Sequence, residues 1–112
     1  MGDSIFHKFV SGEVKPNTKV YFDDAEFMAF DSIEPKHPVH ILIIPKKEIV
    51  SIADMTERDV ETVGRLLYRA KLLADELGYG DGYRLAFNVR EAGGQTVPYL
   101  HLHLLAGKRF SE

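Results

Sequence analysis

The stretch that decides the fold is Gly93-Gly94-Gln95-Thr96-Val97-Pro98-Tyr99-Leu100-His101-Leu102-His103-Leu104-Leu105. After the glycine pair and two short polar residues, leucines alternate with Tyr99, His101 and His103. This period of two predicts a β-strand, because successive side chains of a strand point to opposite faces. We therefore expect the leucines to enter a core and the two histidines to project side by side from the other face, roughly 6–7 Å apart.

The histidine pair gives the predicted strand a chemical character. An imidazole can attack, donate a hydrogen bond or ligate a metal near neutral pH, and the backbone N–H groups of a glycine-rich turn can hold an anion. The pattern therefore predicts a site for an anionic group, and it leaves metal binding open.

Three blocks of the sequence resemble one known family. Residues 94–105 resemble the signature of the histidine triad (HIT) superfamily, specifically of its Hint-type nucleoside phosphoramidases and nucleotide hydrolases. That signature is His-φ-His-φ-His-φ-φ, with φ apolar, after Gly-Gln-Ser/Thr-Val. Tyr99 stands where the signature has its first histidine. Residues 31–47 and 82–88 resemble further blocks of the family in the same order, so the resemblance covers nearly the whole chain.

The composition narrows the class of protein. A chain of 112 residues has the usual size of one domain, and we expect a single HIT domain over residues 1–112. Its lack of cysteine excludes disulfides and thiolate zinc sites. A formal net charge of −3 argues against broad nucleic-acid binding. With no long apolar run, we expect no membrane partner and a cytoplasmic location.

The remaining pattern predicts an α+β fold, in which an antiparallel sheet of about five strands is combined with one short and one long helix. The short helix is expected between an N-cap at Ser4 and Gly12, and further strands are expected over residues 19–22, 26–30, 39–44 and 82–88. The long helix begins near Thr56, ends at Gly78 and packs on the sheet. Its apolar or small stripe comprises Val60, Val63, Leu67, Ala70, Ala74 and Leu77.

The resemblance assigns the chemistry to histidines. It implies that His101 is the nucleophile, that His103 donates a hydrogen bond to a phosphate oxygen, and that His40 supports them. A nucleophilic imidazole needs an acceptor for its other ring N–H. The resemblance implies that this acceptor is the backbone carbonyl of the residue at the first triad position. Tyr99 occupies this position and has the same backbone carbonyl. Tyr99 is kept among the expected catalytic residues, because its hydroxyl can donate and accept a hydrogen bond, although with a pKa near 10 it stays neutral where a histidine can be charged.

The resemblance also implies groups around a bound nucleotide. Gln95 and Thr96 are expected to form hydrogen bonds near the phosphate and the leaving group. The expected substrate-binding residues are Asn88, Gly94, Phe6, Phe30, Asp31, Ser32 and Ile33. For Asn88, a turn-forming role at the strand end is the alternative to a place near phosphate and ribose.

Some of these residues have simpler explanations. Aromatic side chains such as Phe6 and Phe30 are buried more often than they bind ligands, although the resemblance places them beside a purine base. The family has an acidic residue on the ribose hydroxyls at the position of Ser32, so a ribose contact by Asp31 or Ser32 stays open. We expect His7 to be an exposed helix residue.

The sequence supports three functions. The first is hydrolysis or transfer at the α-phosphorus of purine nucleoside phosphoramidates or related nucleotides, through a nucleotidyl-histidine intermediate and without a required cofactor. The second is nucleotide binding with impaired catalysis, because of Tyr99. The third is zinc binding by His40, His101 and His103. The resemblance further implies a two-fold homodimer in which the long helices and residues 81–88 pair and extend the sheet.

Overall fold

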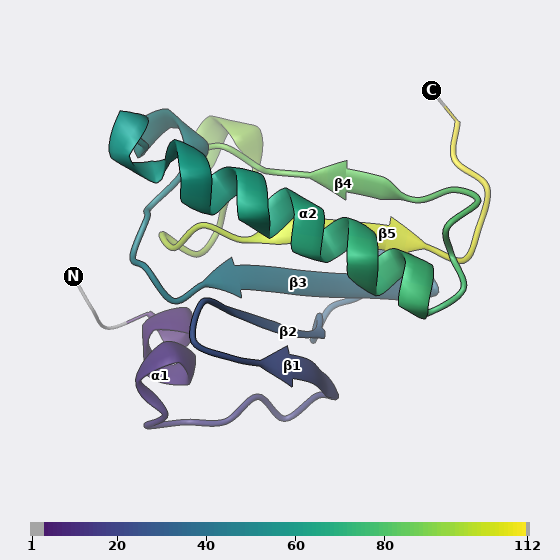
Figure 1. Cartoon of the computed structure of the whole chain (residues 1–112), viewed down its shortest axis with the longest axis horizontal. Helices are drawn as coiled ribbons and strands as arrows, with labels where there is room; N and C mark the ends of the chain where they lie inside the picture. The colour runs from purple at the N-terminus through teal and green to yellow at the C-terminus, as the bar shows by residue number, and fades with distance from the viewer. Residues whose placement is uncertain (1–3, 112) are drawn as a thin grey trace.

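Five antiparallel strands form one sheet in the order β1-β2-β3-β5-β4 within residues 4–111, the part of the chain that the computed structural model describes (Figure 1). The strands are β1 (Val20–Asp23), β2 (Phe27–Asp31), β3 (Val39–Pro45), β4 (Arg84–Ala86) and β5 (Leu102–Ala106). The helices are α1 (Ile5–Ser11) and α2 (Val60–Glu76), with short 3-10 turns at Ile52–Asp54, Glu57–Asp59 and Glu91–Gly93. The predicted α+β architecture, with one long and one short helix, is confirmed.

Both faces of the central strands are covered. Ile41 and Ile43 of β3 belong to the core under α2, which packs across β3 and β5 (Figure 1). The alternate residues Leu42 and Ile44 belong to a second apolar cluster on the opposite face. A strand covered on both sides is apolar at successive positions, which explains why residues 39–44 are almost wholly apolar.

The long helix buries a slightly different stripe from the predicted one. Its buried residues are Val63, Leu66, Ala70, Leu73 and Ala74. The prediction was wrong for Val60 and Leu67, which are 59% and 38% exposed, because a period of 3.6 residues places both at the margin of this stripe. No helix within residues 4–111 has the length and apolar character to cross a membrane.

The helix ends follow the predicted capping signals. The Ser4 hydroxyl accepts a hydrogen bond from the backbone N–H of His7 at the start of α1, and Gly12 closes this helix with φ 83°. Thr56 accepts from the N–H of Arg58, but it caps the 3-10 turn Glu57–Asp59, and α2 itself begins after this turn with Asp59 at its N-cap position. Gly78 has φ 90° and follows the last turn of α2, where the glycine lets the chain turn away.

Two predicted strands are shorter in the structure. Only Arg84–Ala86 of the expected strand over residues 82–88 pairs, and it pairs with β5 alone. The histidine strand begins at Leu102. The preceding Leu100 donates its N–H to the Ile49 carbonyl instead, at 2.7 Å. The alternation nevertheless holds, because Leu100, Leu102 and Leu104 are all buried in the core under α2.

Candidate active site

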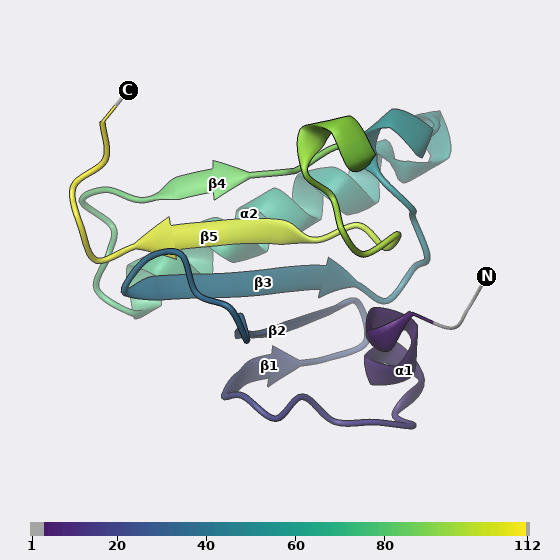
Figure 2. The same ribbon diagram turned by 180° about the vertical axis from the view of Figure 1, so that it is seen from behind.

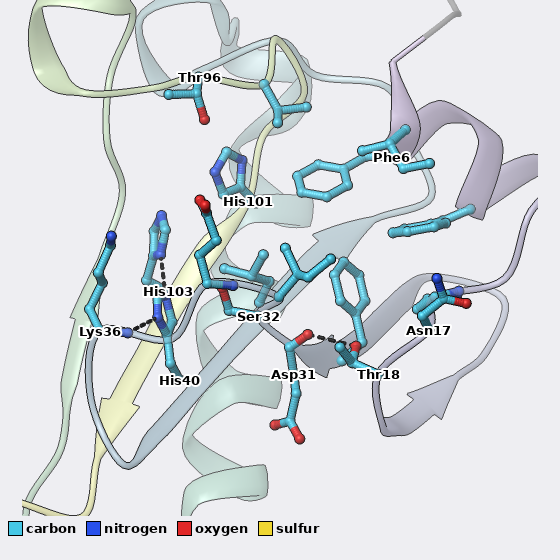
Figure 3. A pocket seen from close by; sticks show the side chains of 18 of the residues that line it. Phe6, Asn17, Thr18, Asp31, Ser32, Lys36, His40, Thr96, His101 and His103 are labelled. Carbon is cyan, nitrogen blue, oxygen red and sulfur yellow. Dashed lines mark hydrogen bonds between the residues drawn. The ribbon is translucent and has the colours of Figure 1, made fainter.

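A cavity of about 550 Å³ is lined by residues of α1, β2, β3 and the β5 segment (Figure 3). Seen from the sheet face opposite α2, α1 lies beside the strands (Figure 2). Histidines of β3 and of the β5 segment lie at one end of it, and phenylalanines lie at the other (Figure 3). The predicted site residues that line it are Phe6, Phe30, Asp31, Ser32, Ile33, His40, Asn88, Gly94, Thr96, His101 and His103. Segments distant in the sequence therefore meet in one cavity.

His101 is held by the main chain just before β5. Its Nδ1 lies 2.8 Å from the carbonyl oxygen of Tyr99, and the residue is only 7% exposed. A carbonyl oxygen can only accept, so Nδ1 carries the proton and Nε2 keeps its lone pair. Burial lowers the pKa of His101, while the hydrogen bond to Tyr99 acts in the opposite direction. The carbonyl acceptor expected for the ring N–H of His101 is therefore present.

His40 and His103 form a hydrogen-bonded relay. The backbone N–H of Lys36 donates to Nδ1 of His40 at 2.9 Å, so a neutral His40 carries its proton on Nε2. That Nε2 lies 2.9 Å from Nδ1 of His103 and donates to it. The proton of His103 must then be on Nε2, a buried atom without a hydrogen-bond partner among the described residues. The relay thus makes His103 a donor.

Burial keeps all three imidazoles neutral at pH 7. It lowers the pKa of His103 to about 4, with further contributions from His101 and His40. It also lowers the pKa of His40, where the nearby His37 and Lys36 add to the effect. Neutral rings are what a nucleophile and a hydrogen-bond donor of fixed tautomer require.

The His101 and His103 rings form a complementary pair. Their centroids are 5.0 Å apart, and their tautomers present a lone pair and an N–H respectively. A lone pair can attack an electrophilic centre while a neighbouring N–H binds an oxygen of the same group. The pair is therefore suited to a phosphoryl centre.

Three phenylalanines form the other end of the cavity. Phe6 lies with its ring centroid 5.7 Å from that of Phe30 and 6.0 Å from that of Phe9, and Phe9 and Phe30 are 5.2 Å apart. Phe6 also contacts the His101 ring at 5.1 Å, so the aromatic end adjoins the histidines. Such surfaces fit a flat base. Phe6 and Phe30 serve packing as well, since both are buried in the second apolar cluster.

The carboxylate of Asp31, one of two acidic residues that line the cavity, is engaged elsewhere. The Asp31 carboxylate accepts a hydrogen bond from the Tyr21 hydroxyl at 2.6 Å, and Figure 3 shows it pointing away from the histidines. Ser32 accepts from the backbone N–H of Glu34 through its hydroxyl. Both residues line the cavity, but their ligand contacts, like that of Ile33, remain predictions.

Tyr99 does not offer its side chain to the cavity. The residue is 1% exposed, and its hydroxyl donates to the Pro45 carbonyl at 2.6 Å. Burial, with a smaller effect of the Glu48 charge, raises the pKa of Tyr99 to about 12. The alternation puts Tyr99 on the same face as His101 and His103, but Phe6 of α1 covers its side chain there, and Tyr99 does not line the cavity.

His7 also differs from its prediction. It is half-buried, with its ring 4.8 Å from that of Tyr99 and its Nε2 2.9 Å from a Glu48 oxygen. Its Nδ1 contacts the Ser4 hydroxyl at 2.6 Å within the helix cap. The contacts with Tyr99 and Glu48 explain why it is not an exposed helix residue.

Gln95 holds the loop together and does not line the cavity. Its Oε1 accepts from the Arg90 N–H at 2.8 Å, and its Nε2 donates to the carbonyls of Val50 and Val97 at 2.7 and 3.0 Å. The structure thus contradicts the expected place of this amide near a phosphate. Thr96, the next residue, lines the cavity, and its hydrogen bond near a phosphate stays a prediction. A sequence motif does not show which way an amide of a loop turns.

Several cavity residues were missed by the sequence analysis. They include Phe9, Asn17, Thr18 and Lys36. Phe9, Asn17 and Thr18 lie outside the three blocks of the sequence that resemble the family. Lys36 had one usable signal, its position four residues before His40 in a proline-containing loop.

The three histidines do not form a suitable donor set for zinc. His40 uses both ring nitrogens in hydrogen bonds, and His103 uses Nδ1 and carries a proton on Nε2. Only Nε2 of His101 then offers a lone pair, whereas zinc takes three or four such ligands. Within residues 4–111 no group of three or more His, Cys, Asp or Glu is arranged to hold a metal ion.

Comparison with known proteins gives consistent matches over most of the chain. The HIT domain model matches residues 13–110. The adenylylsulfatase HINT1 of Arabidopsis thaliana is 40% identical over 110 residues, covering 96% of this chain and 74% of that protein. The 14 kDa zinc-binding protein of Brassica juncea is 41% identical, covering 97% and 96%. The crystal structure of a HIT family hydrolase from Legionella pneumophila Philadelphia 1 has a TM-score of 0.91 and 44% identity, covering 97% and 96%.

Proposed function

Because this chain belongs to the HIT domain family and presents a lone pair of His101 and an N–H of His103 to one cavity, we propose that it is a nucleotide-binding hydrolase or transferase. Its substrates are purine nucleoside phosphoramidates or related nucleotides, cleaved at the α-phosphorus. The observation that carries the proposal is the hydrogen bond from His101 Nδ1 to the Tyr99 carbonyl, since it leaves Nε2 free to attack.

The proposed reaction has two steps. Nε2 of His101 attacks the α-phosphorus, the bond from phosphorus to the leaving group breaks, and a nucleotidyl-histidine forms. The ring becomes cationic because Nδ1 keeps its proton, and the Tyr99 carbonyl stabilises that charge. Water then attacks the phosphorus, the N–P bond breaks, and neutral His101 is restored. His103 binds a phosphate oxygen through its Nε2–H, or passes this proton to an amine leaving group in the first step and takes one back from the attacking water in the second.

The position of Tyr99 favours catalysis over binding alone. The carbonyl that the proposed nucleophile needs is a main-chain group, which a change of side chain leaves in place. The tyrosine side chain is directed to Pro45, away from the cavity. The substituted triad position is therefore compatible with a working His101.

The proposed nucleoside site is the aromatic end of the cavity. Phe6, Phe9 and Phe30 offer apolar surface to a base, and the adjoining histidines then face its 5′-phosphate. Thr96 and Asn88 line the same cavity and are proposed to contact the phosphate. The base preference for purine comes from the family resemblance.

We also propose that the protein is a homodimer. Strand β4 lies at an edge of the sheet, and α2 exposes Val60, Leu67, Tyr68 and Leu72. A second copy related by a two-fold axis would cover this helix face and extend the sheet at β4. Sedimentation equilibrium is expected to give twice the chain mass, and Tyr68→Glu is expected to shift the protein toward monomer. A native monomer at micromolar concentration would contradict this proposal.

The activity is tested by mixing the purified protein with adenosine 5′-phosphoramidate and with a fluorogenic nucleoside phosphoramidate. We expect product release by the native protein and a loss of about 10⁴-fold or more in His101→Ala, as for removal of a nucleophile. Absence of turnover, with adenosine monophosphate still bound, would instead favour a binding protein. Stoichiometric zinc retained after dialysis, with activity lost on chelation, would support the zinc alternative.

A further inference from the structure

Lys36 brings a positive charge to the histidine end of the cavity. It lines the cavity, and its backbone N–H donates to Nδ1 of His40 at 2.9 Å. In Figure 3, Lys36 and Phe6 lie on opposite sides of His101 and His103. The relay to His103 therefore fixes the main chain from which this side chain extends.

The ammonium of Lys36 has no carboxylate partner among residues 4–111. Lys46, Lys47 and Lys71, by contrast, each form an ion pair with an aspartate. Lys36 is exposed, so its charge is hydrated and costs little to maintain. An unpaired ammonium at the edge of a cavity can bind an anion without first breaking an ion pair.

The proposed position of the nucleotide determines which part of the substrate lies near Lys36. With the nucleoside against the phenylalanines, the α-phosphorus lies at His101 and His103. In a displacement at phosphorus the nucleophile and the leaving group lie roughly in line, so the leaving group departs on the side opposite Nε2 of the buried His101. Lys36 is exposed and lines the same cavity, so its long side chain can reach a group that departs toward solvent.

We propose that Lys36 binds the leaving group and makes the protein favour nucleotides whose leaving group is an oxyanion, such as sulfate, over those that release an amine. The inference rests on the proposed function and adds a residue that determines specificity. When the bond from phosphorus to oxygen breaks, its electron pair stays on the sulfate oxygen, which needs no proton and is stabilised by the ammonium. An amine must instead take a proton, which His103 can supply.

One other charge of the same loop opposes this effect. Glu34 also lines the cavity and lies two residues before Lys36. Its carboxylate repels an anionic leaving group, so the two residues are expected to act on selectivity with opposite signs. If charge sets the selectivity, neutralising Lys36 and neutralising Glu34 change it in opposite directions. A merely structural role of the loop would not give opposite changes.

The first experiment compares kcat/KM for adenosine 5′-phosphosulfate and adenosine 5′-phosphoramidate. Lys36→Gln is expected to lower the value for the phosphosulfate roughly 10-fold, the effect of one charge-assisted hydrogen bond, and that for the phosphoramidate less than about 2-fold. Glu34→Gln is expected to raise the preference for the phosphosulfate. Lys108→Gln makes the same charge change outside the cavity and is expected to alter neither value. An equal loss for both substrates in Lys36→Gln, or no loss, would overturn the proposal.

A binding experiment separates this inference from the proposed function. Calorimetry measures the dissociation constants of both nucleotides for His101→Ala and for His101→Ala/Lys36→Gln, in which no nucleophile is present. The added Lys36→Gln change is expected to raise the dissociation constant of the phosphosulfate roughly 10-fold relative to that of the phosphoramidate. An unchanged ratio would refute the role of Lys36 even if the protein is a hydrolase. If Lys36→Gln changes the relative affinities as expected but the native protein turns over neither nucleotide, the proposed hydrolase activity would be refuted. The role of Lys36 in binding the anion would stand.

Discussion

The Nδ1 atom of His101 lies 2.8 Å from the carbonyl oxygen of Tyr99, two residues earlier in the chain. The tautomer of the proposed nucleophile is thus set by a main-chain group and does not depend on which side chain precedes it. The Tyr99 side chain has a separate task, because its hydroxyl binds the Pro45 carbonyl at the end of β3. We therefore expect the backbone carbonyl of Tyr99 to matter for activity and its side-chain hydroxyl to matter for stability.

Tyr99→Phe is expected to keep activity within about 3-fold while lowering the free energy of unfolding by about 1–2 kcal/mol. The carbonyl that holds His101 remains, whereas a buried hydrogen bond of 2.6 Å is lost. Phosphoramidase assays and urea unfolding measure the two effects. A loss of activity beyond about 100-fold in a folded variant would show that the phenol takes part in the chemistry.

His40→Phe is expected to lower kcat for an amine leaving group by about 100-fold with little change in nucleotide affinity. In this variant no N–H of residue 40 donates to Nδ1 of His103. The proton of His103 can then move to Nδ1, and its Nε2 no longer donates a hydrogen bond into the cavity. Steady-state kinetics and titration with adenosine monophosphate separate the two quantities. Equal losses in affinity and kcat would point to a collapsed cavity rather than to the relay.

The buried histidines predict a loss of stability in mild acid. An unfolded histidine titrates near about 6.5, whereas the pKa values of His40, His101 and His103 are lowered in the folded protein. Between pH 6.5 and the folded values the unfolded state binds more protons, so stability is complete above about 6.5 and falls as the pH decreases toward about 4 for His103.

Urea unfolding between pH 7.5 and 5 measures this effect, in a range where most carboxylates stay ionised. His103→Gln is the control, and its stability is expected to fall less steeply over the same range. A native stability that is constant or increases on acidification to pH 5 would contradict the neutral state of these rings.

The backbone conformation at position 90 favours glycine over the arginine that occupies it. Its φ of 59° and ψ of −179° lie in a region open essentially to glycine alone. Arg90→Gly is therefore expected to be more stable than Arg90→Ala by about 1 kcal/mol or more, although alanine is usually the better residue. Both variants lose the ion pair with Asp54, so the comparison isolates the backbone. Equal unfolding free energies would argue against strain at this position.

The sequence predicted elements whose signals are local. Alternation of leucine and histidine identified the two faces of β5, and Ser4, Gly12, Thr56 and Gly78 marked the ends of the helices. Such signals depend on backbone periodicity and capping, which a short window contains. Burial of residues at the margin of α2 depends on the sheet beneath it, and Val60 and Leu67 were therefore placed wrongly.

The candidate site was predictable in its histidines but not in its loops. The resemblance brought His40, His101 and His103 together, and the structure adds the hydrogen bonds that set the tautomers, the relay for His40 and His103 and the Tyr99 carbonyl for His101. The direction of the Gln95 amide and the burial of Tyr99 depend on contacts with segments some 45 to 54 residues distant. Short sequence patterns do not contain such contacts.

The most direct test of the account is the protonation state of the ring nitrogens at neutral pH. Nitrogen-15 NMR of the histidine-labelled protein distinguishes nitrogens that carry a proton from those that carry a lone pair, and single substitutions assign each ring. The structure predicts a proton on Nδ1 of His101 and on Nε2 of both His40 and His103, with lone pairs on the other three nitrogens. A proton on Nε2 of His101 would contradict the account, because the proposed nucleophile would then have no lone pair facing the cavity.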